Sequence, residues 1–182
     1  MRIVSGKYKG KRIEAPRKLP VRPTTDMAKE ALFNILNNRY YFEDLTVLDL
    51  FSGIGSISLE FASRGCKDIT AVDGHAGCVT FLSQTSEDLG ADIKCIRSEA
   101  INFLKKTPGK FDVIFADPPY ELEKDEFTKL VDQVMERNLL KEDGILIVEH
   151  STRMKLLDHE FFVETRKYGS SSFSFFANSA SS

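Results

Sequence analysis

The chain has 182 residues, of which 42% are hydrophobic and 29% charged, so it can bury the core of one ordinary domain. This composition excludes an entirely disordered chain, a collagen and a coiled coil. The longest uninterrupted apolar runs have four residues, far short of the ~20 that a membrane-spanning helix needs. We therefore expect one globular domain without a membrane span.

The formal net charge of −2 is unevenly distributed along the chain. Residues 1–22 carry eight lysine or arginine side chains and one glutamate, a net charge of +7, and the remaining residues carry −9. A basic segment attached to an acidic body is typical of a module that binds phosphate groups. The alternative is a basic hairpin that is merely solvated.

The sequence also bears on the cellular compartment and on metals. The N-terminus has no apolar segment of the kind that an export signal contains. Cys66, Cys78 and Cys95 are an odd number of cysteines at wide spacing, which fits reduced thiols packed in a core. The three histidines do not group with these cysteines at the spacing of metal ligands. We expect a cytoplasmic protein with no metal site.

The N-terminal segment predicts a hairpin followed by an arm and a helix. Arg2–Ser5 and Lys11–Ala15 are extended in pattern and are joined by a connection with a glycine at each end, which predicts a β-hairpin. Prolines at positions 16, 20 and 23 favour an extended arm. Thr24 or Thr25 can cap a helix, because apolar residues follow at helical spacing: Ala28, Ala31, Leu32, Ile35 and Leu36.

From residue 46 the pattern alternates between buried strands and amphipathic helices. The expected strands are 46–51, 68–73, 93–98, 111–117 and 144–150, and the expected helices are 56–64, 75–89, 99–107 and 124–139. Continuous Val, Ile and Leu runs separated by helices predict an α/β fold whose mostly parallel sheet is covered on both faces. The stretch 161–178 contains two further β-like segments, which we expect as an antiparallel pair at one sheet edge, with phenylalanines that pack in the core.

The first expected strand contains Asp49 and leads into a turn with Gly53 and Gly55. A Gly-x-Gly turn between a strand and a helix lets backbone N–H groups approach a ligand closely. Ile57 and Ser58 occupy the place of the third glycine of the dinucleotide-binding fingerprint, which disfavours a pyrophosphate ligand and a dehydrogenase. Asp49 adds a carboxylate at the sheet edge where ligands of doubly wound folds lie.

Two more acidic residues follow expected strands. Asp73 ends the second strand, where a carboxylate can accept hydrogen bonds from both hydroxyls of a ribose. The alternative for Asp73 is a cap of the helix that begins near His75. Glu99 follows the third strand, where it could accept a hydrogen bond from an adenine amino group, and helix capping is an equally natural role there.

The fourth expected strand leads directly into Asp117, Pro118, Pro119 and Tyr120. The two prolines fix φ and remove two backbone donors, so that nearby carbonyl groups can face a ligand. Asp117 and one of these carbonyls can accept both hydrogens of an exocyclic amino group, while Tyr120 offers a stacking face for a planar base. The alternative is a proline-rich turn with a tyrosine packed in the core.

The D-P-P-Y motif at 117–120, preceded by the turn with Gly53 and Gly55, resembles amino-group methyltransferases that use S-adenosylmethionine. The stretches MRIVSGKYKG (1–10), RPTT (22–25) and KEALFN (29–34) are similar to those of the RsmD-type small-subunit rRNA guanine-N2 methyltransferases. This resemblance runs from residue 1 to about 150. The chain departs from the family at Met27, where arginine is common, at Glu99, where aspartate is usual, and in its short serine-rich tail.

The resemblance implies a class I, Rossmann-like methyltransferase domain over 1–182, with a basic hairpin and arm (1–24), a catalytic core (25–178) and a frayed tail (179–182). It implies that the transfer depends on Asp117, Pro118, Pro119 and Tyr120. The residues expected to bind the cofactor are Asp49, Phe51, Gly53, Gly55, Asp73, Glu99 and Ala100. The residues expected to bind RNA are Arg2, Lys7, Lys9, Lys11, Arg12 and Arg22.

The implied substrate is a guanine of 16S rRNA, either in free RNA or in a partly assembled small subunit. The implied enzyme is a monomer that needs neither a membrane nor a metal. Two alternatives stay open at this point. The same D-P-P-Y corner would serve an adenine-N6 methyltransferase acting on DNA or RNA. A nucleic-acid-binding module that has kept an inactive methyltransferase fold is the other alternative.

Overall fold

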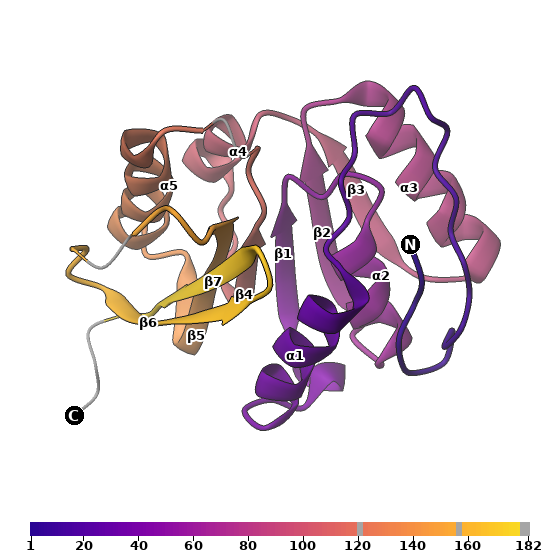
Figure 1. Cartoon of the computed structure of the whole chain (residues 1–182), viewed down its shortest axis with the longest axis horizontal. Helices are drawn as coiled ribbons and strands as arrows, with labels where there is room; N and C mark the ends of the chain where they lie inside the picture. The colour runs from indigo at the N-terminus through magenta and orange to yellow at the C-terminus, as the bar shows by residue number, and fades with distance from the viewer. Residues whose placement is uncertain (120–121, 156–157, 179–182) are drawn as a thin grey trace.

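The computed structural model describes residues 1–119, 122–155 and 158–178. They contain a seven-stranded sheet with the order β3-β2-β1-β4-β5-β7-β6 (Figure 1). The strands are β1 Thr46–Leu50, β2 Asp68–Asp73, β3 Ile93–Arg97, β4 Phe111–Ala116, β5 Leu140–Ser151, β6 Phe162–Tyr168 and β7 Ser171–Phe176. The first five are parallel, and β7 runs antiparallel to both β5 and β6. The expected mostly parallel sheet with an antiparallel pair at one edge is therefore confirmed.

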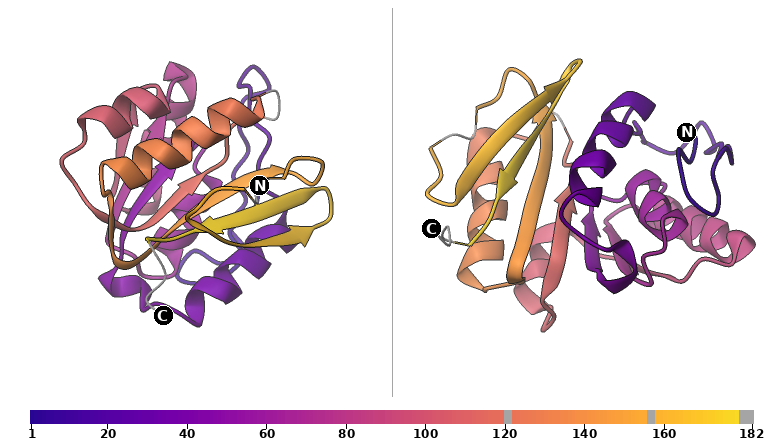
Figure 2. Two further views of the ribbon diagram at one scale, coloured as in Figure 1. Left: turned by 90° about the vertical axis from the view of Figure 1, so that its left-hand side faces the viewer. Right: turned by 90° about the horizontal axis from the view of Figure 1, so that it is seen from below.

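In the part of the chain that the structure describes, five α-helices pack on this sheet in two layers (Figure 2). They are α1 Asp26–Asn37, α2 Ser56–Ser63, α3 Ala76–Leu89, α4 Ala100–Lys106 and α5 Lys124–Glu136, and a short 3-10 helix spans Phe42–Asp44. Helices α1, α2 and α3 cover one face, and α4 and α5 cover the other. No helix of the described residues is long and apolar enough to cross a membrane.

The sheet is buried on both faces, as the continuous apolar runs predict. Successive side chains of a strand point to opposite faces. In β1, Val47 packs in the core beneath α1 and α2, whereas the next residue, Leu48, packs in the core beneath α4 and α5. Val113 and Ile114 of β4 divide between the two cores in the same way. The phenylalanines of the last strand, at positions 173, 175 and 176, are core residues, as expected.

Most helix and strand ends lie within one residue of their expected positions, but the connection from α5 to β5 differs. Helix α5 ends at Glu136, three residues before the expected end, and β5 begins four residues early, at Leu140. Asn138 has a left-handed φ of 54°, which an L residue in a continuing α-helix does not adopt. This residue therefore ends the helix and lets the chain enter the sheet sooner.

The expected N-terminal hairpin forms but is shorter than predicted: backbone hydrogen bonds join Ile3 to Lys11 and Ile13 to Met1, whereas the N–H groups of Val4 and Ser5 bond to Glu60. One isolated antiparallel bridge joins Arg2 to Arg12, and no strand forms on either side of it within 1–22. The residues between them turn onto helix α2 instead: the backbone N–H of Lys7 donates to the carbonyl oxygen of Ser63 at 2.7 Å. Gly6 has a φ of 90°, and a Cβ there would lie 2.0 Å from the Ser63 carbonyl oxygen. Contact with α2 thus takes the backbone groups that a longer hairpin would pair.

The expected extended arm also folds back once. The N–H of Leu19 donates to the carbonyl of Pro16 at 3.0 Å, which makes a turn where an extended chain was expected. Leu19 is buried and packs against Ile54 and Cys78. This hydrophobic contact brings the next residues, 20–25, over the edge of the sheet.

A buried ion pair anchors the N-terminal segment to α1 and α2. The side chains of Lys29 and Glu60 are both fully buried, with Nζ 3.5 Å from Oε1. The Lys29 ammonium also donates to the carbonyl oxygen of Arg2, and the Glu60 carboxylate accepts the N–H groups of Val4 and Ser5. Desolvation lowers the pKa of Lys29, opposed by the charge of Glu60. Sequence analysis did not identify this pair, because nothing local distinguishes its members from solvated charges.

The cap of α1 offers a test of local stability. Thr25 Oγ1 accepts the N–H of Ala28 at 3.2 Å, as the sequence predicts. Thr25→Ala should lower the free energy of unfolding by about 1 kcal/mol, because one N–H of the first turn loses its acceptor. Urea denaturation measures the change. Thr25→Ser, which keeps the hydroxyl, is the control, and equal stability of the two variants would show that this cap contributes nothing.

Candidate active site

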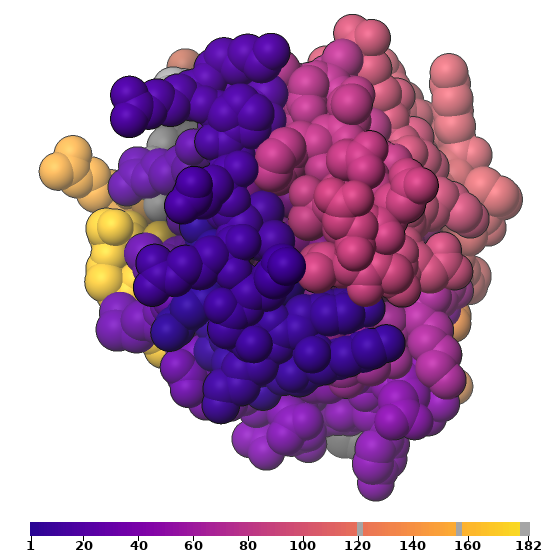
Figure 3. Space-filling view, turned by 90° about the vertical axis from the view of Figure 1, so that its right-hand side faces the viewer, coloured from indigo at the N-terminus to yellow at the C-terminus, as the bar shows by residue number. Residues whose placement is uncertain are grey.

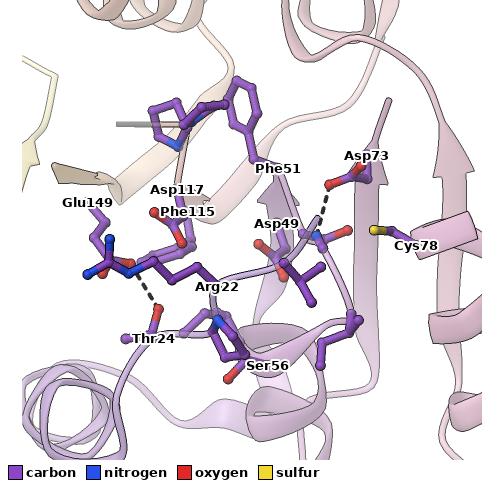
Figure 4. A pocket seen from close by; sticks show the side chains of 18 of the residues that line it. Arg22, Thr24, Asp49, Phe51, Ser56, Asp73, Cys78, Phe115, Asp117 and Glu149 are labelled. Carbon is purple, nitrogen blue, oxygen red and sulfur yellow. Dashed lines mark hydrogen bonds between the residues drawn. The ribbon is translucent and has the colours of Figure 1, made fainter. Parts of the chain in front are cut away.

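A cavity of about 650 Å³ opens at the carboxyl ends of the parallel strands (Figure 4). Its walls come from the ends of β1, β2, β4 and β5, from residues 20–25 of the N-terminal arm, and from Ser170 and Ser171 at the start of β7. The strand order reverses between β1 and β4, and ligands of doubly wound sheets bind at such a point. The sheet therefore places the cavity where the sequence motifs were expected to act.

The turn between β1 and α2 depends on its glycines. Phe51, Gly53 and Gly55 all have positive φ, of 57°, 54° and 89°. A Cβ on Gly55 would lie 2.2 Å from Cδ1 of Leu82, so only glycine fits between the turn and α3. Phe51 and Gly53 line the cavity, whereas Gly55 lies behind its wall as the N-cap of α2.

Asp49 lines the cavity, and Ser58 of helix α2 holds its carboxylate by hydrogen bonds. Its Oδ2 accepts the backbone N–H of Ser58 at 3.2 Å and the Ser58 hydroxyl at 2.6 Å. Burial raises the pKa of Asp49 to about 7, against the opposing effect of the two Ser58 hydrogen bonds. Asp49 thus ties strand β1 to the first turn of α2 and holds the glycine turn in shape.

Asp73 stands at one end of the cavity, at the end of β2 (Figure 4). One carboxylate oxygen accepts the N–H of Gly53 at 2.9 Å, and the other accepts the N–H of His75 at 2.8 Å. The N-cap of α3 is His75, whose side chain accepts the N–H of Cys78, so Asp73 is not that cap. Each Asp73 oxygen keeps a second lone-pair direction for a ligand in the cavity.

Glu99 also lines this end of the cavity. It is the N-cap residue of α4, but its side chain makes no capping hydrogen bond, so the expected alternative role does not occur. A Cβ on Gly74 would lie 2.8 Å from Glu99 Oε1, so the bare backbone at Gly74 lets this carboxylate lie against the end of β2. Ala100 is buried in the core beneath α4 and does not line the cavity.

The other end of the cavity is formed by Asp117, Pro118 and Pro119, which directly follow β4 (Figure 4). Pro118 is buried, Asp117 is half-buried and Pro119 is exposed. Tyr120, the fourth residue of the motif, lies outside the described residues, so its expected stacking role stays a prediction.

The partner of Asp117 was not predicted from the sequence. Glu149, near the end of β5, lines the cavity beside it. Glu149 also accepts the hydroxyl of Thr24 at 2.9 Å and a hydrogen bond from Ser171. In the sequence, Glu149 is visible only as an acidic residue directly after the apolar run 145–148. The order of the strands is what brings it next to Asp117.

Burial and charge shift both carboxyls in the same direction. Burial, followed by the negative charge of Glu149 and the hydrogen bond to it, raises the pKa of Asp117 well above its usual range. Burial raises the pKa of Glu149 as well, against the opposing hydrogen bonds from Thr24 and Ser171. The positive charge of Arg22, which also lines the cavity, acts in the opposite direction on both.

The basic residues expected to bind RNA divide into two groups. Arg22 belongs to the cavity wall (Figure 4). The others lie outside the cavity on the segment that crosses the surface of the molecule (Figure 3): Arg2, Lys7, Lys9, Lys11 and Arg12, all exposed. Arg2 forms an ion pair with Asp26 at 3.1 Å.

The described residues contain no group of three or more His, Cys, Asp or Glu side chains arranged to hold a metal ion. Cys66 and Cys78 are buried, as expected, and Cys95 is only partly buried. His150 bonds to the Ser174 hydroxyl at 2.6 Å and serves the packing of β5 on β7.

Comparisons with known proteins agree on the family and the fold. The family model described as Conserved hypothetical protein 95 matches residues 1–177. The ribosomal RNA small subunit methyltransferase D of Buchnera aphidicola subsp. Baizongia pistaciae is 31% identical over 162 residues, which make up 86% of this chain and 79% of that protein.

Solved structures show the same architecture. A hypothetical protein of Thermus thermophilus has a TM-score of 0.84 and 25% identity, with 97% of this chain and 98% of that chain covered. The 16S rRNA N2 G1207 methyltransferase (RsmC) of T. thermophilus, in complex with AdoMet and guanosine, has a TM-score of 0.67 and 24% identity, with 87% of this chain and 44% of that chain covered. The similarity to this second structure shows a shared fold only.

Proposed function

Because the chain belongs to the family of RsmD-type small-subunit ribosomal RNA methyltransferases and so uses S-adenosylmethionine, we propose that it methylates the exocyclic N2 amine of a guanine in 16S rRNA. The observation that carries the proposal is that Asp73 and Asp117 lie at opposite ends of one cavity, at the switch point of the sheet. The Asp73 end suits a nucleoside, and the Asp117 end suits an exocyclic amino group.

The residues at the Asp73 end fit the nucleoside part of the cofactor. Asp73 would accept the ribose hydroxyls, and Glu99 would accept the adenine amino group, because its carboxylate caps no helix. The amino-acid part would lie against the turn at Gly53, where the backbone approaches closely. When bound, S-adenosylmethionine supplies a methyl group already activated by its sulfonium, so no residue needs to protonate a leaving group.

The residues at the Asp117 end would prepare the amine. The lone pair of guanine N2 is delocalised into the ring, which makes this nitrogen a poor nucleophile. The Asp117 carboxylate and the Pro118 carbonyl would accept its two hydrogens and turn the lone pair towards the methyl group. Burial of Pro118 and partial burial of Asp117 limit the competition from water. Catalysis of this kind consists of positioning and electrostatics.

The guanine must reach this corner outside a base-paired stack, either unpaired already or flipped out. Arg22 lies at the cavity wall, where its positive charge can meet the phosphate next to the flipped base. The exposed residues Lys7, Lys9, Lys11 and Arg12 would bind RNA farther away.

Methyl transfer to ribosomal RNA from cells that lack this enzyme tests the proposal. The protein is incubated with labelled S-adenosylmethionine and either naked 16S rRNA or small-subunit particles, and the nucleosides are identified by mass spectrometry. We expect N2-methylguanosine, and the better of the two substrates shows whether assembly precedes methylation. N6-methyladenosine would instead support the adenine enzyme, and cofactor binding without transfer to either substrate would support the inactive module.

The basic segment should contribute to RNA affinity and not to cofactor affinity. Replacing Lys7, Lys9, Lys11 and Arg12 by alanine should raise the dissociation constant for rRNA and flatten its log–log salt dependence by up to about three units, because fewer counterions are released. Cofactor affinity should stay the same, since none of the four lines the cavity. Filter binding at several salt concentrations measures the slope.

The matched control removes four exposed lysines from the α4 and α5 side of the molecule: Lys105, Lys106, Lys110 and Lys129. This variant changes the net charge by the same amount. If both variants lower the slope equally, the N-terminal segment has no special role and RNA docks elsewhere.

A further inference from the structure

Two carboxyl groups lie side by side at the Asp117 end of the cavity. Strands β4 and β5 are parallel neighbours, with Ala116 in register with Val148. The residue that follows each of these is an acid, Asp117 directly after β4 and Glu149 within β5, so the two carboxyl groups are neighbours at the edge of the sheet (Figure 4). Both line the cavity, and the Glu149 residue is only 3% exposed.

Two ionised carboxylates are hydrogen-bond acceptors only, so Asp117 and Glu149 can bond to each other only when one of them carries a proton. At this depth two adjacent negative charges repel strongly, so the pair favours holding one proton. The donors around the pair indicate where it lies. Glu149 accepts hydrogen bonds from Thr24 and Ser171, which stabilise its charged form, so a shared proton would reside chiefly on Asp117.

Two other charged groups act on the pair, in opposite directions. Asp49 of β1 adds a negative charge that favours retention of the shared proton. Arg22 of the N-terminal arm adds a positive charge that favours its release. The behaviour of Asp117 therefore depends chiefly on its burial and on Glu149, the group in direct contact with it.

We propose that Glu149 is a positioning residue of the acceptor site, which shares one proton with Asp117 and so sets the pH above which Asp117 can accept hydrogen bonds from the amine. This inference rests on the proposed function. While Asp117 carries the shared proton, its donor is directed at Glu149 and its affinity for an amine hydrogen is weak. Loss of that proton makes Asp117 a full acceptor.

The same pair accounts for the proton that methylation releases. As the amine nitrogen bonds to the methyl carbon, the bond from that carbon to the sulfonium sulfur would break and leave a neutral thioether, and the nitrogen would then lose one hydrogen as a proton. Ionised Asp117 accepts this proton, which comes to rest between the two carboxyls and restores the shared-proton state. Glu149 makes Asp117 a stronger base for this step, and the proton leaves to solvent before the next turnover.

Glu149→Gln separates this role from a merely structural one. The amide oxygen of glutamine can still accept from Thr24 and Ser171, so the cavity wall is kept. In single-turnover transfer to rRNA, the wild-type rate should rise with pH as Asp117 loses its proton. In Glu149→Gln the rise should move to lower pH by about one unit or more, because the adjacent negative charge is gone.

Glu142→Gln is the matched control, since Glu142 is an exposed glutamate of the same strand. It should leave the pH profile unchanged. If Glu149→Gln lowers the transfer rate by the same factor at every pH, and the rate still rises at the wild-type pH, the proposal is overturned. Glu149 would then have only a structural role.

A second measurement does not depend on activity. Carbon-13 NMR of the side-chain carboxyls, assigned with Asp117→Asn and Glu149→Gln and with the Asp49 signal identified separately, follows the pair in the protein without RNA. We expect the Asp117 and Glu149 signals to titrate together, with the last proton lost well above the usual range of an aspartate. Two carboxyls that ionise independently at ordinary pH would refute the shared proton.

The two measurements distinguish the failure of this inference from the failure of the proposed function. A protein that methylates no RNA but shows the coupled titration contradicts the proposed function and keeps the carboxyl pair. A protein that methylates guanine but whose pH profile does not respond to Glu149→Gln contradicts the inference alone.

Discussion

Asp117→Ala is expected to lower the rate of methyl transfer by ~10²-fold or more, because one positioned acceptor of the reacting amine is lost. The dissociation constant of S-adenosylmethionine should stay within a few-fold of the wild-type value, since Asp117 lies at the opposite end of the cavity from Asp73 (Figure 4). Single-turnover transfer to rRNA measures the rate, and calorimetric titration measures cofactor binding.

Asp117→Asn refines the same test. The amide keeps the size of the side chain and one acceptor oxygen but cannot take up a proton. We expect it to be nearly as slow as Asp117→Ala if proton uptake limits the reaction, and much faster if positioning alone matters. Asp92→Ala, at an exposed aspartate outside the cavity, is the control. Near-normal turnover of Asp117→Ala would remove Asp117 from the proposed mechanism.

Asp73→Ala should weaken cofactor binding by ~10²-fold or more. Two charge-assisted hydrogen bonds to the ribose would be lost, each worth roughly 1.5–3 kcal/mol. The same substitution removes the acceptor of the Gly53 and His75 N–H groups, so the glycine turn also loses a support. Calorimetric titration with S-adenosylmethionine measures the affinity.

The thermal midpoint of the ligand-free protein separates the two roles of Asp73. A loss of affinity much greater than the loss of stability supports direct ribose binding. A lowered thermal midpoint with an unchanged dissociation constant would mean that Asp73 serves only the turn. Asp68→Ala, at the exposed start of the same strand, controls for the loss of a carboxylate.

The order and type of the elements from residue 46 onward could be predicted because their signals are local. A strand buried on both faces needs an unbroken apolar run, and a helix needs apolar residues at helical spacing. The positions of Asp73 and Asp117 followed from the same logic, since parallel strands end at one edge of the sheet. The end of α5 was missed although Asn138 is a residue type that often takes the left-handed conformation just past a helix end, as it does here.

The N-terminal segment shows the limit of local signals. Its two extended segments and the glycines between them favour a hairpin, but Glu60 and Ser63 of α2, more than 50 residues away in the sequence, bind its backbone N–H groups. Local sequence patterns do not indicate this competition, because Glu60 and Ser63 come close to the segment only once α2 has packed against it. That Arg22 binds RNA stays a prediction, and the structure places this residue at the cavity wall.

The sequence by itself determined the α/β class, the glycine turn and the acidic strand ends, because each depends on residues close together in the chain. Only the tertiary structure decided which side chains meet. Glu149 reaches Asp117 because β5 is the neighbour of β4, and Thr24 reaches Glu149 across 125 residues of sequence. Lys29 finds Glu60 because α1 and α2 cover the same face of the sheet. Such pairs depend on long-range packing, which no short pattern of residues encodes.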